Sequence, residues 1–118
     1  MLRAMAVVAI VSLAGAASAA AQGTAAQGEK VFAAQKCGLC HSVGGKGNPK
    51  GPLDEAVGKL SAADIREWIT DAKGMTAKTK ATRKPAMKEF ALPKEDVDAL
   101  VAYLSSIKKK RLLRIRSR

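Results

Sequence analysis

The apolar residues of this 118-residue chain recur at the spacing of an α-helix in two stretches. The first stretch consists of Ile65, Trp68, Ile69 and Ala72. The second consists of Val97, Leu100, Val101 and Leu104. Residues three, four and seven positions apart share one face of a helix. The pattern therefore predicts two amphipathic helices in the second half of the chain.

Polar residues and helix breakers indicate where these helices begin and end. Ser61 followed by Asp64 has the form of a helix N-cap, and Gly74 is expected to end that helix. Pro93 suits the first turn of the later helix. Residues 108–110 are all lysine, which a helix C-terminus favours.

A third helix is expected over residues 28–35, which contain good helix formers and no breaker after Gly28. Gly28 and Phe32 lie on one face of this helix, and a gap beside a large ring invites another helix to cross closely there. An ordinary amphipathic helix, the alternative, would need no glycine at this position.

The remaining segments are predicted to be largely irregular. Residues 22–27 are expected to form a small polar leader, and residues 42–52, with four glycines and two prolines, a loop. Short extra turns are expected over residues 53–58, and irregular structure over 75–91. No segment has the pattern of a strand, so the fold class predicted is all-α with three main helices.

The N-terminus has the form of a secretory signal. Arg3 precedes an apolar stretch over residues 5–17, and small residues suitable for cleavage follow near residues 19 and 21. The expectation is a cleaved signal over residues 1–21 and a domain over residues 22–107. An uncleaved membrane anchor is the alternative, although the stretch is short for a membrane span.

The net charge of +11 is concentrated in a basic tail over residues 108–118. The tail contains seven Lys or Arg and no acidic residue. Its leucines and isoleucine among arginines are compatible with weak contact at an anionic membrane surface. The alternative is a solvated extension of the last helix. A main function in nucleic-acid binding is dismissed, because the chain is expected to be exported and the tail has no aromatic residue.

Cys37, Cys40 and His41 form the sequence Cys-Gly-Leu-Cys-His, the attachment signature of a c-type haem. These are the only cysteines and the only histidine in the chain. A thioredoxin-like redox pair would sit among alternating strands and helices, which the pattern does not contain. A structural zinc site would need four ligands, and the chain offers three. Covalent attachment of one haem c is therefore the favoured interpretation.

Over residues 28–107 the chain resembles class I c-type cytochromes, in particular small soluble monohaem carriers of bacteria. The resemblance rests on the cysteine motif, on Gly-Pro-Leu at residues 51–53, on a late methionine near Pro85, and on Leu-Val-Ala-Tyr-Leu at residues 100–104. It implies a cytochrome c-like fold, with three main helices packed around one covalently attached haem.

The resemblance also implies roles for individual residues. Cys37 and Cys40 would form the thioether bonds, and His41 would be the proximal iron ligand. The Pro52 carbonyl would accept a hydrogen bond from the second ring nitrogen of His41. Trp68 would pack beside the haem and reach a propionate, with plain core packing as the alternative.

Two further expectations concern helix packing. Gly28 and Phe32 would meet the last helix near Leu100 and Tyr103. Phe32 lies five residues before Cys37, whereas many relatives have four, so the helix is expected to end or bulge before the motif.

Met87 is the expected sixth iron ligand. Because His41, the only histidine, would already bind the iron, a methionine thioether is the expected second ligand. Only Met75 and Met87 remain after removal of the signal. Met87 lies where the family places its ligand, although Lys88 stands where a proline is common. Met75, the alternative, follows Gly74 and precedes a Lys/Thr run.

A haem iron with two protein ligands predicts a periplasmic one-electron carrier and not an enzyme. A haem enzyme or gas sensor with an open sixth position is the alternative. Partners would be redox proteins such as membrane-bound reductases or oxidases, and the carrier is expected to be a monomer. Surface lysines would steer these encounters. The candidates are Lys36, Lys46, Lys50, Lys84 and Lys88.

Overall fold

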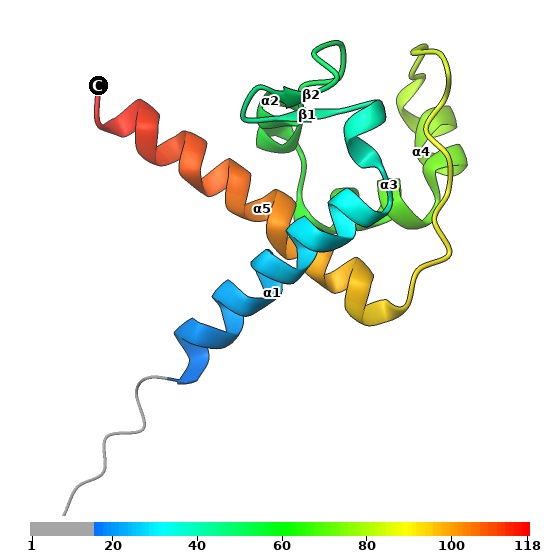
Figure 1. Cartoon of the computed structure of the whole chain (residues 1–118). Helices are drawn as coiled ribbons and strands as arrows, with labels where there is room; N and C mark the ends of the chain where they lie inside the picture. The colour runs from blue at the N-terminus through cyan, green and yellow to red at the C-terminus, as the bar shows by residue number, and fades with distance from the viewer. Residues whose placement is uncertain (1–15) are drawn as a thin grey trace, which may run out of the picture.

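The computed structural model describes residues 16–118, with side chains from Thr24 onward. Its helices are α1 (Ala16–Ala34), α2 (Leu53–Ala56), α3 (Ala62–Thr70), α4 (Ala72–Thr79) and α5 (Lys94–Arg116). Two 3₁₀ turns, η1 (Cys37–Leu39) and η2 (Val57–Lys59), and two short strands, β1 (Ser42–Val43) and β2 (Lys46–Gly47), complete the elements. The predominance of helix agrees with the expected fold class (Figure 1).

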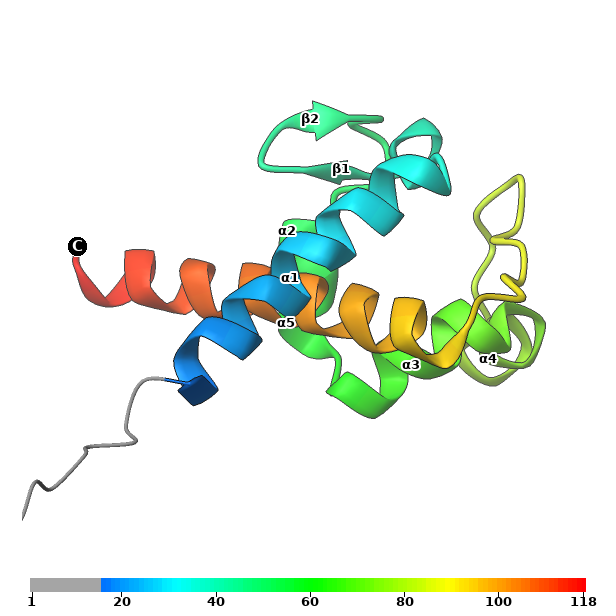
Figure 2. The ribbon, with the colours of Figure 1, turned by 60° about the horizontal axis from the view of Figure 1, so that its bottom comes forward.

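The two longest helices, α1 and α5, cross closely at Gly28 (Figures 1 and 2). A Cβ on Gly28 would overlap the carbonyl oxygen of Ala99 and lie 2.6 Å from the Cβ of Tyr103. One turn later Phe32 packs edge-on against Tyr103, with ring centroids 5.7 Å apart. The close crossing predicted from Gly28 and Phe32 is confirmed.

Helix α1 begins earlier than the sequence pattern indicated. Residues 22–27 are helical, so the predicted polar leader is wrong. The physical reason is the composition of the whole start of α1, since alanine has the highest helix propensity and occupies seven of residues 16–26. The expected cleavage positions near residues 19 and 21 fall within α1, while residues 1–15 of the predicted signal lie outside the described part of the chain.

Helix α1 ends at Ala34, before the cysteine motif, as the spacing of Phe32 and Cys37 predicted. Lys36 adopts a left-handed backbone conformation, with φ of 56°, and redirects the chain into η1. Its amide donates to the Ala33 carbonyl at 3.1 Å, which closes the last turn.

The main core lies where α1, α3, α5 and η2 meet. Its buried residues are Val31, Val57, Ile65, Ile69, Val97, Leu100, Val101, Leu104 and Ile107. Helix α3 begins with the predicted capping box, in which Ser61 and Asp64 each accept a hydrogen bond from the other's backbone N–H. A charged cluster also joins α3 to α5, since Asp98 binds both Arg66 and Lys94.

The predicted end of this helix at Gly74 is wrong. Asp71 breaks the helix after Thr70, and its side chain accepts a hydrogen bond from the Gly74 N–H at 3.0 Å to cap the next helix. Gly74 therefore lies inside α4, and residues 75–79, expected to be irregular, are helical. A left-handed Lys80 then ends α4.

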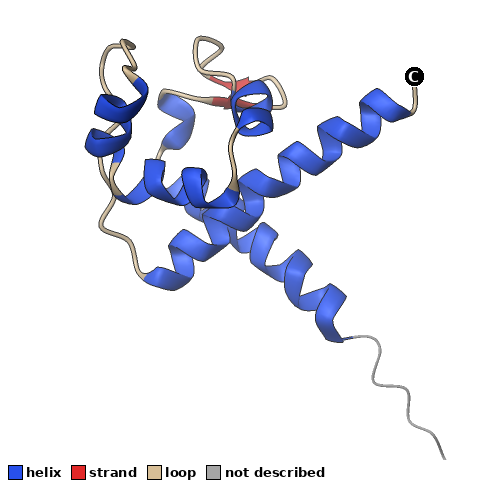
Figure 3. Cartoon of the chain, turned by 180° about the vertical axis from the view of Figure 1, so that it is seen from behind, coloured by secondary structure: helices blue, strands red, loops and turns tan. Residues whose placement is uncertain are grey.

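The prediction of no strands is also wrong, because residues 42–47 form a small antiparallel hairpin (Figure 3). Gly44 and Gly45 connect its strands with φ values of 59° and 80°. Positive φ at both central residues gives the turn the twist that paired strands need. The rest of the predicted loop is irregular, and the short turns expected over residues 53–58 are confirmed as α2 and η2.

Helix α5 begins directly after Pro93, close to the predicted start, and continues past the expected end at residues 108–110. The basic tail is thus helical as far as Arg116. None of the helices in the described part of the chain combines the length and the hydropathy of a membrane span.

Candidate functional site

The cysteine motif forms a single tight turn. The amides of Cys40 and His41 both donate to the Cys37 carbonyl, at 3.1 and 2.9 Å. In a 3₁₀ turn, residues three apart eclipse one another, so Cys37 and Cys40 project from the same side. Cys37 is half-buried, Cys40 is exposed, and both thiols are free. The turn therefore brings the two cysteines close together, with His41 directly after it.

His41 is half-buried immediately after this turn, and its ring is oriented by the backbone. Its Nδ1–H donates to the Gly51 carbonyl at 3.3 Å. Among the described residues, Nε2 has no hydrogen-bond partner. Burial lowers the pKa of His41, although its bond to Gly51 opposes that effect. A neutral imidazole with Nε2 available has the form required of a metal ligand.

The hydrogen bond of His41 goes to the carbonyl of Gly51 and not to the carbonyl of the next residue, Pro52, which the resemblance had implied. Pro52 is exposed and is the N-cap of α2. An N-cap carbonyl normally accepts the first hydrogen bond of its helix, which engages it elsewhere. The Gly51 carbonyl also accepts the Ser42 amide at 2.9 Å, so it is held firmly beside His41.

Asn48 fastens the hairpin to the cysteine turn, a role that the sequence interpretation did not assign. Its backbone amide donates to the carbonyls of Gly38 and His41, each at 3.0 Å. Its side-chain amide donates to the Leu39 carbonyl at 3.0 Å. The preceding Gly47 has φ of 107°, and a Cβ there would overlap the His41 carbonyl. The glycine-rich loop thus cradles the turn.

Arg83, also not anticipated, links the segment between α4 and α5 to the same turn. Its guanidinium donates to the Cys40 carbonyl at 2.6 Å and packs against Gly51. Its positive charge helps to lower the pKa of His41. Burial raises the pKa of the Cys37 thiol, and the charge of Lys88 partly offsets this. The segment that contains Met87 therefore lies close to the cysteine turn.

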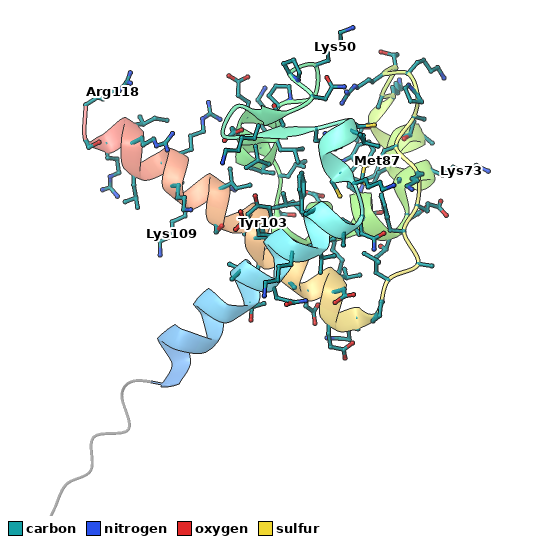
Figure 4. The ribbon with its side chains drawn as sticks, in the orientation of Figure 1. Lys50, Lys73, Met87, Tyr103, Lys109 and Arg118 are labelled. Carbon is teal, nitrogen blue, oxygen red and sulfur yellow. The ribbon has the colours of Figure 1, made fainter. Side chains whose placement is uncertain are left out.

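Met87, labelled in Figure 4, is half-buried in this segment. It lines an open hollow of about 480 Å³. The other residues lining the hollow are Lys73, Thr76, Ala77, Ala86, Lys88 and Glu89. Met75, the alternative sulfur ligand, lies within α4 and is only 3% exposed. Met87 therefore lies in an irregular segment with a partly accessible side chain, whereas Met75 lies in a helix with its side chain buried.

Trp68 lies on α3 and is half-buried. In the described part of the chain it is not among the side chains that pack against the main core. Its indole N–H also has no hydrogen-bond acceptor among residues 24–118. A large ring with an unused donor remains available to a group outside the core.

Comparison with known proteins identifies the family to which the chain is similar. The family model described as cytochrome c matches residues 25–108. The cytochrome c oxidase subunit 2 of Alkalihalophilus pseudofirmus is 34% identical over 91 residues, which cover 70% of this chain and 25% of that protein. The chain therefore spans about a quarter of the length of this relative. No solved structure is significantly similar.

Proposed function

Because the chain belongs to the cytochrome c family, we propose that it is a one-electron carrier with a single, covalently bound haem c. The family assignment supports electron transfer in general terms. The observation that carries the specific proposal is the Cys37–His41 turn, which holds two free cysteines three residues apart and an imidazole whose Nδ1 is already engaged. When bound, the haem would supply an iron that alternates between two oxidation states.

The residues of the turn fit this group. Cys37 and Cys40 would attach it through two thioether bonds, because both are free and lie three residues apart in one turn. His41 would bind the iron through Nε2. The hydrogen bond to Gly51 would hold the imidazole in one orientation and tautomer, which raises its basicity as a ligand.

Met87 would provide the sixth ligand. The contacts of Arg83 and Lys88, which bring its segment to the cysteine turn, support this assignment. A thioether stabilises the reduced iron and raises the reduction potential, which suits a carrier. Trp68 would donate its free indole N–H toward a haem propionate, because no described residue uses that proton.

The protein would function outside the cytoplasm, in the periplasm, after export directed by its N-terminal segment. Its partners would be redox proteins such as membrane-bound reductases or terminal oxidases, and the relationship to an oxidase subunit supports the latter. Lys36, Lys46, Lys50, Lys84 and Lys88 are all exposed. They would steer the carrier toward acidic docking faces and speed transient encounters.

Carbon monoxide tests whether this protein is a carrier or a haem enzyme or sensor with an open sixth position. We expect the reduced, haem-loaded protein to show little spectral change under carbon monoxide at neutral pH, because Met87 occupies the position. The alanine variant of Met87 is the positive control and should bind the gas readily. Rapid, stoichiometric binding to the unaltered protein would contradict the carrier function and support the alternative.

A further inference from the structure

The C-terminal part of α5 projects beyond the body of the protein as a basic arm, defined here as residues 108–118 (Figures 1 and 4). The helix has buried residues as far as Ile107, and every residue from Lys109 onward is exposed. Lys108 donates from Nζ to the Leu60 carbonyl at 3.2 Å, and the Arg111 side chain reaches Gly58. These contacts fix the direction in which the arm leaves the body.

The arm concentrates positive charge without internal compensation. It contains seven Lys or Arg and no acidic residue. Within the described part of the chain, none of its side chains forms an ion pair. Like charges three or four residues apart destabilise a helix, so this segment would gain from a neutralising surface.

Three of the arginines lie together on one side of the arm. Arg111, Arg114 and Arg118 line a shallow hollow of about 220 Å³ with Ile115 and Ser117. Guanidinium groups bind phosphate oxygens in a bidentate manner, and a row of them matches a row of phosphates. This side of the arm therefore has the chemistry of a phosphate-binding surface.

The same arm exposes large aliphatic side chains. Leu112, Leu113 and Ile115 are 53%, 57% and 61% exposed, although α5 buries its apolar residues elsewhere. Both lipid layers and nucleic acids carry phosphate groups. A lipid layer also has an apolar region just below its headgroups, which can accept aliphatic side chains. A nucleic acid would instead favour aromatic residues for stacking, and the arm has none.

We propose that the basic arm docks the protein on an anionic lipid surface. The arginines would contact lipid phosphates while the leucines and isoleucine enter the interface between headgroups and acyl chains. Docking would hold the body close to a membrane and limit its diffusion to two dimensions. The proposal does not depend on the assigned electron-transfer function.

Vesicle flotation tests the proposal with the exported, haem-loaded protein. The probes are vesicles of phosphatidylcholine alone and of equal parts phosphatidylcholine and phosphatidylglycerol. We expect binding to the anionic vesicles only, and weakening by salt. Replacing Arg111, Arg114 and Arg118 together by glutamine should reduce the partition coefficient about tenfold or more, since each basic residue near such a surface contributes to binding.

A matched variant controls for the loss of charge. Replacing Lys30, Lys78 and Lys80 by glutamine removes the same charge from exposed positions on the body, and should leave most of the binding intact. A second arm variant, L112S/I115S, keeps every charge and should also weaken binding, because it removes apolar side chains that enter the lipid.

Several results would overturn the proposal. They are absence of binding to anionic vesicles, equal binding to both kinds of vesicle, or equal losses in the arginine and lysine variants. Retention of binding in L112S/I115S would reject the entry of the aliphatic side chains. Arm-dependent retention on duplex DNA, without vesicle binding, would identify a nucleic acid as the partner instead.

Discussion

Two methionines compete for the sixth iron position, and their surroundings predict which one binds. Met87 lies in an irregular segment beside an open hollow, whereas Met75 is buried within α4. We expect Met87→Ala to abolish the iron–sulfur absorption band of the oxidised protein and to lower its reduction potential, because a thioether ligand favours reduced iron. Visible spectroscopy and redox titration measure both effects.

Met75→Ala is the matched control. It should leave the iron–sulfur band in place and reduce stability by about 2–5 kcal/mol, the usual cost of truncating a buried methionine. Loss of the band in Met75→Ala, with retention in Met87→Ala, would reverse the assignment.

Gly28 is the residue on which the crossing of α1 and α5 depends. In Gly28→Ala the new methyl group would overlap the Ala99 carbonyl, so the helices must separate. We expect a decrease of about 1–3 kcal/mol in the free energy of unfolding, typical of overpacking. Denaturant unfolding of the haem-loaded protein measures it.

Gly38→Ala provides the comparison for this glycine. A Cβ on Gly38 would meet nothing within 4 Å, so the substitution should leave stability nearly unchanged. Equal losses in the two variants would show that steric contact at the helix crossing is not the cause.

Asp98 joins α3 to α5, and its contribution should depend on pH. Hydrogen bonds from Lys94 and Arg66 hold the pKa of Asp98 below its usual value of 3.8. A carboxylate with a depressed folded-state pKa stabilises the protein above its unfolded-state pKa and loses that effect as pH falls through the folded-state value. Asp98→Asn should therefore be less stable than the unaltered protein near neutral pH.

Chemical denaturation over a pH series checks this expectation. The difference in free energy of unfolding should shrink below the ordinary carboxyl pKa and vanish once Asp98 is protonated in the folded protein. A difference that stays constant across the acid range would show that the two charge contacts do not stabilise the packing of α3 against α5.

The elements that the sequence predicted correctly are those with a clear local pattern of capping residues or apolar positions. The capping box at Ser61 and the buried positions Ile65 and Ile69 of α3 follow from local signals, and the sequence indicated them correctly. The break at Asp71 is a cap inside an otherwise continuous apolar pattern, so α4 was missed. The strands are only two residues long, too short to show alternation. The alanine-rich start of α1 was mistaken for a leader because it lacks an apolar face.

At the scale of the whole molecule, the sequence located the attachment turn but not the contacts that support it. Cys37, Cys40 and His41 form a motif because they are adjacent in the chain. Arg83 binds the Cys40 carbonyl although the two residues are 43 positions apart in the chain, and no local sequence pattern predicts such a contact. The use of Gly51 in place of Pro52 is likewise a difference of one residue that only the folded backbone decides.

Helix α5 shows the same limit for larger features. Its apolar positions indicated a core helix, and the run of lysines suggested an end. The helix instead continues through the basic residues, held at its exit by Lys108 and Leu60. The direction in which the arm projects, which underlies the proposed lipid contact, therefore depends on tertiary contacts.

The central claim is that one haem is bonded covalently to the cysteine turn, and intact-protein mass spectrometry of the exported protein tests it most directly. The account predicts a mass that exceeds the processed chain by one haem, with neither Cys37 nor Cys40 open to alkylation. The same sample, reduced with dithionite, should keep its sharp absorption bands after extraction with acidified acetone. A colourless protein with the mass of the bare chain and two alkylatable thiols would contradict the account.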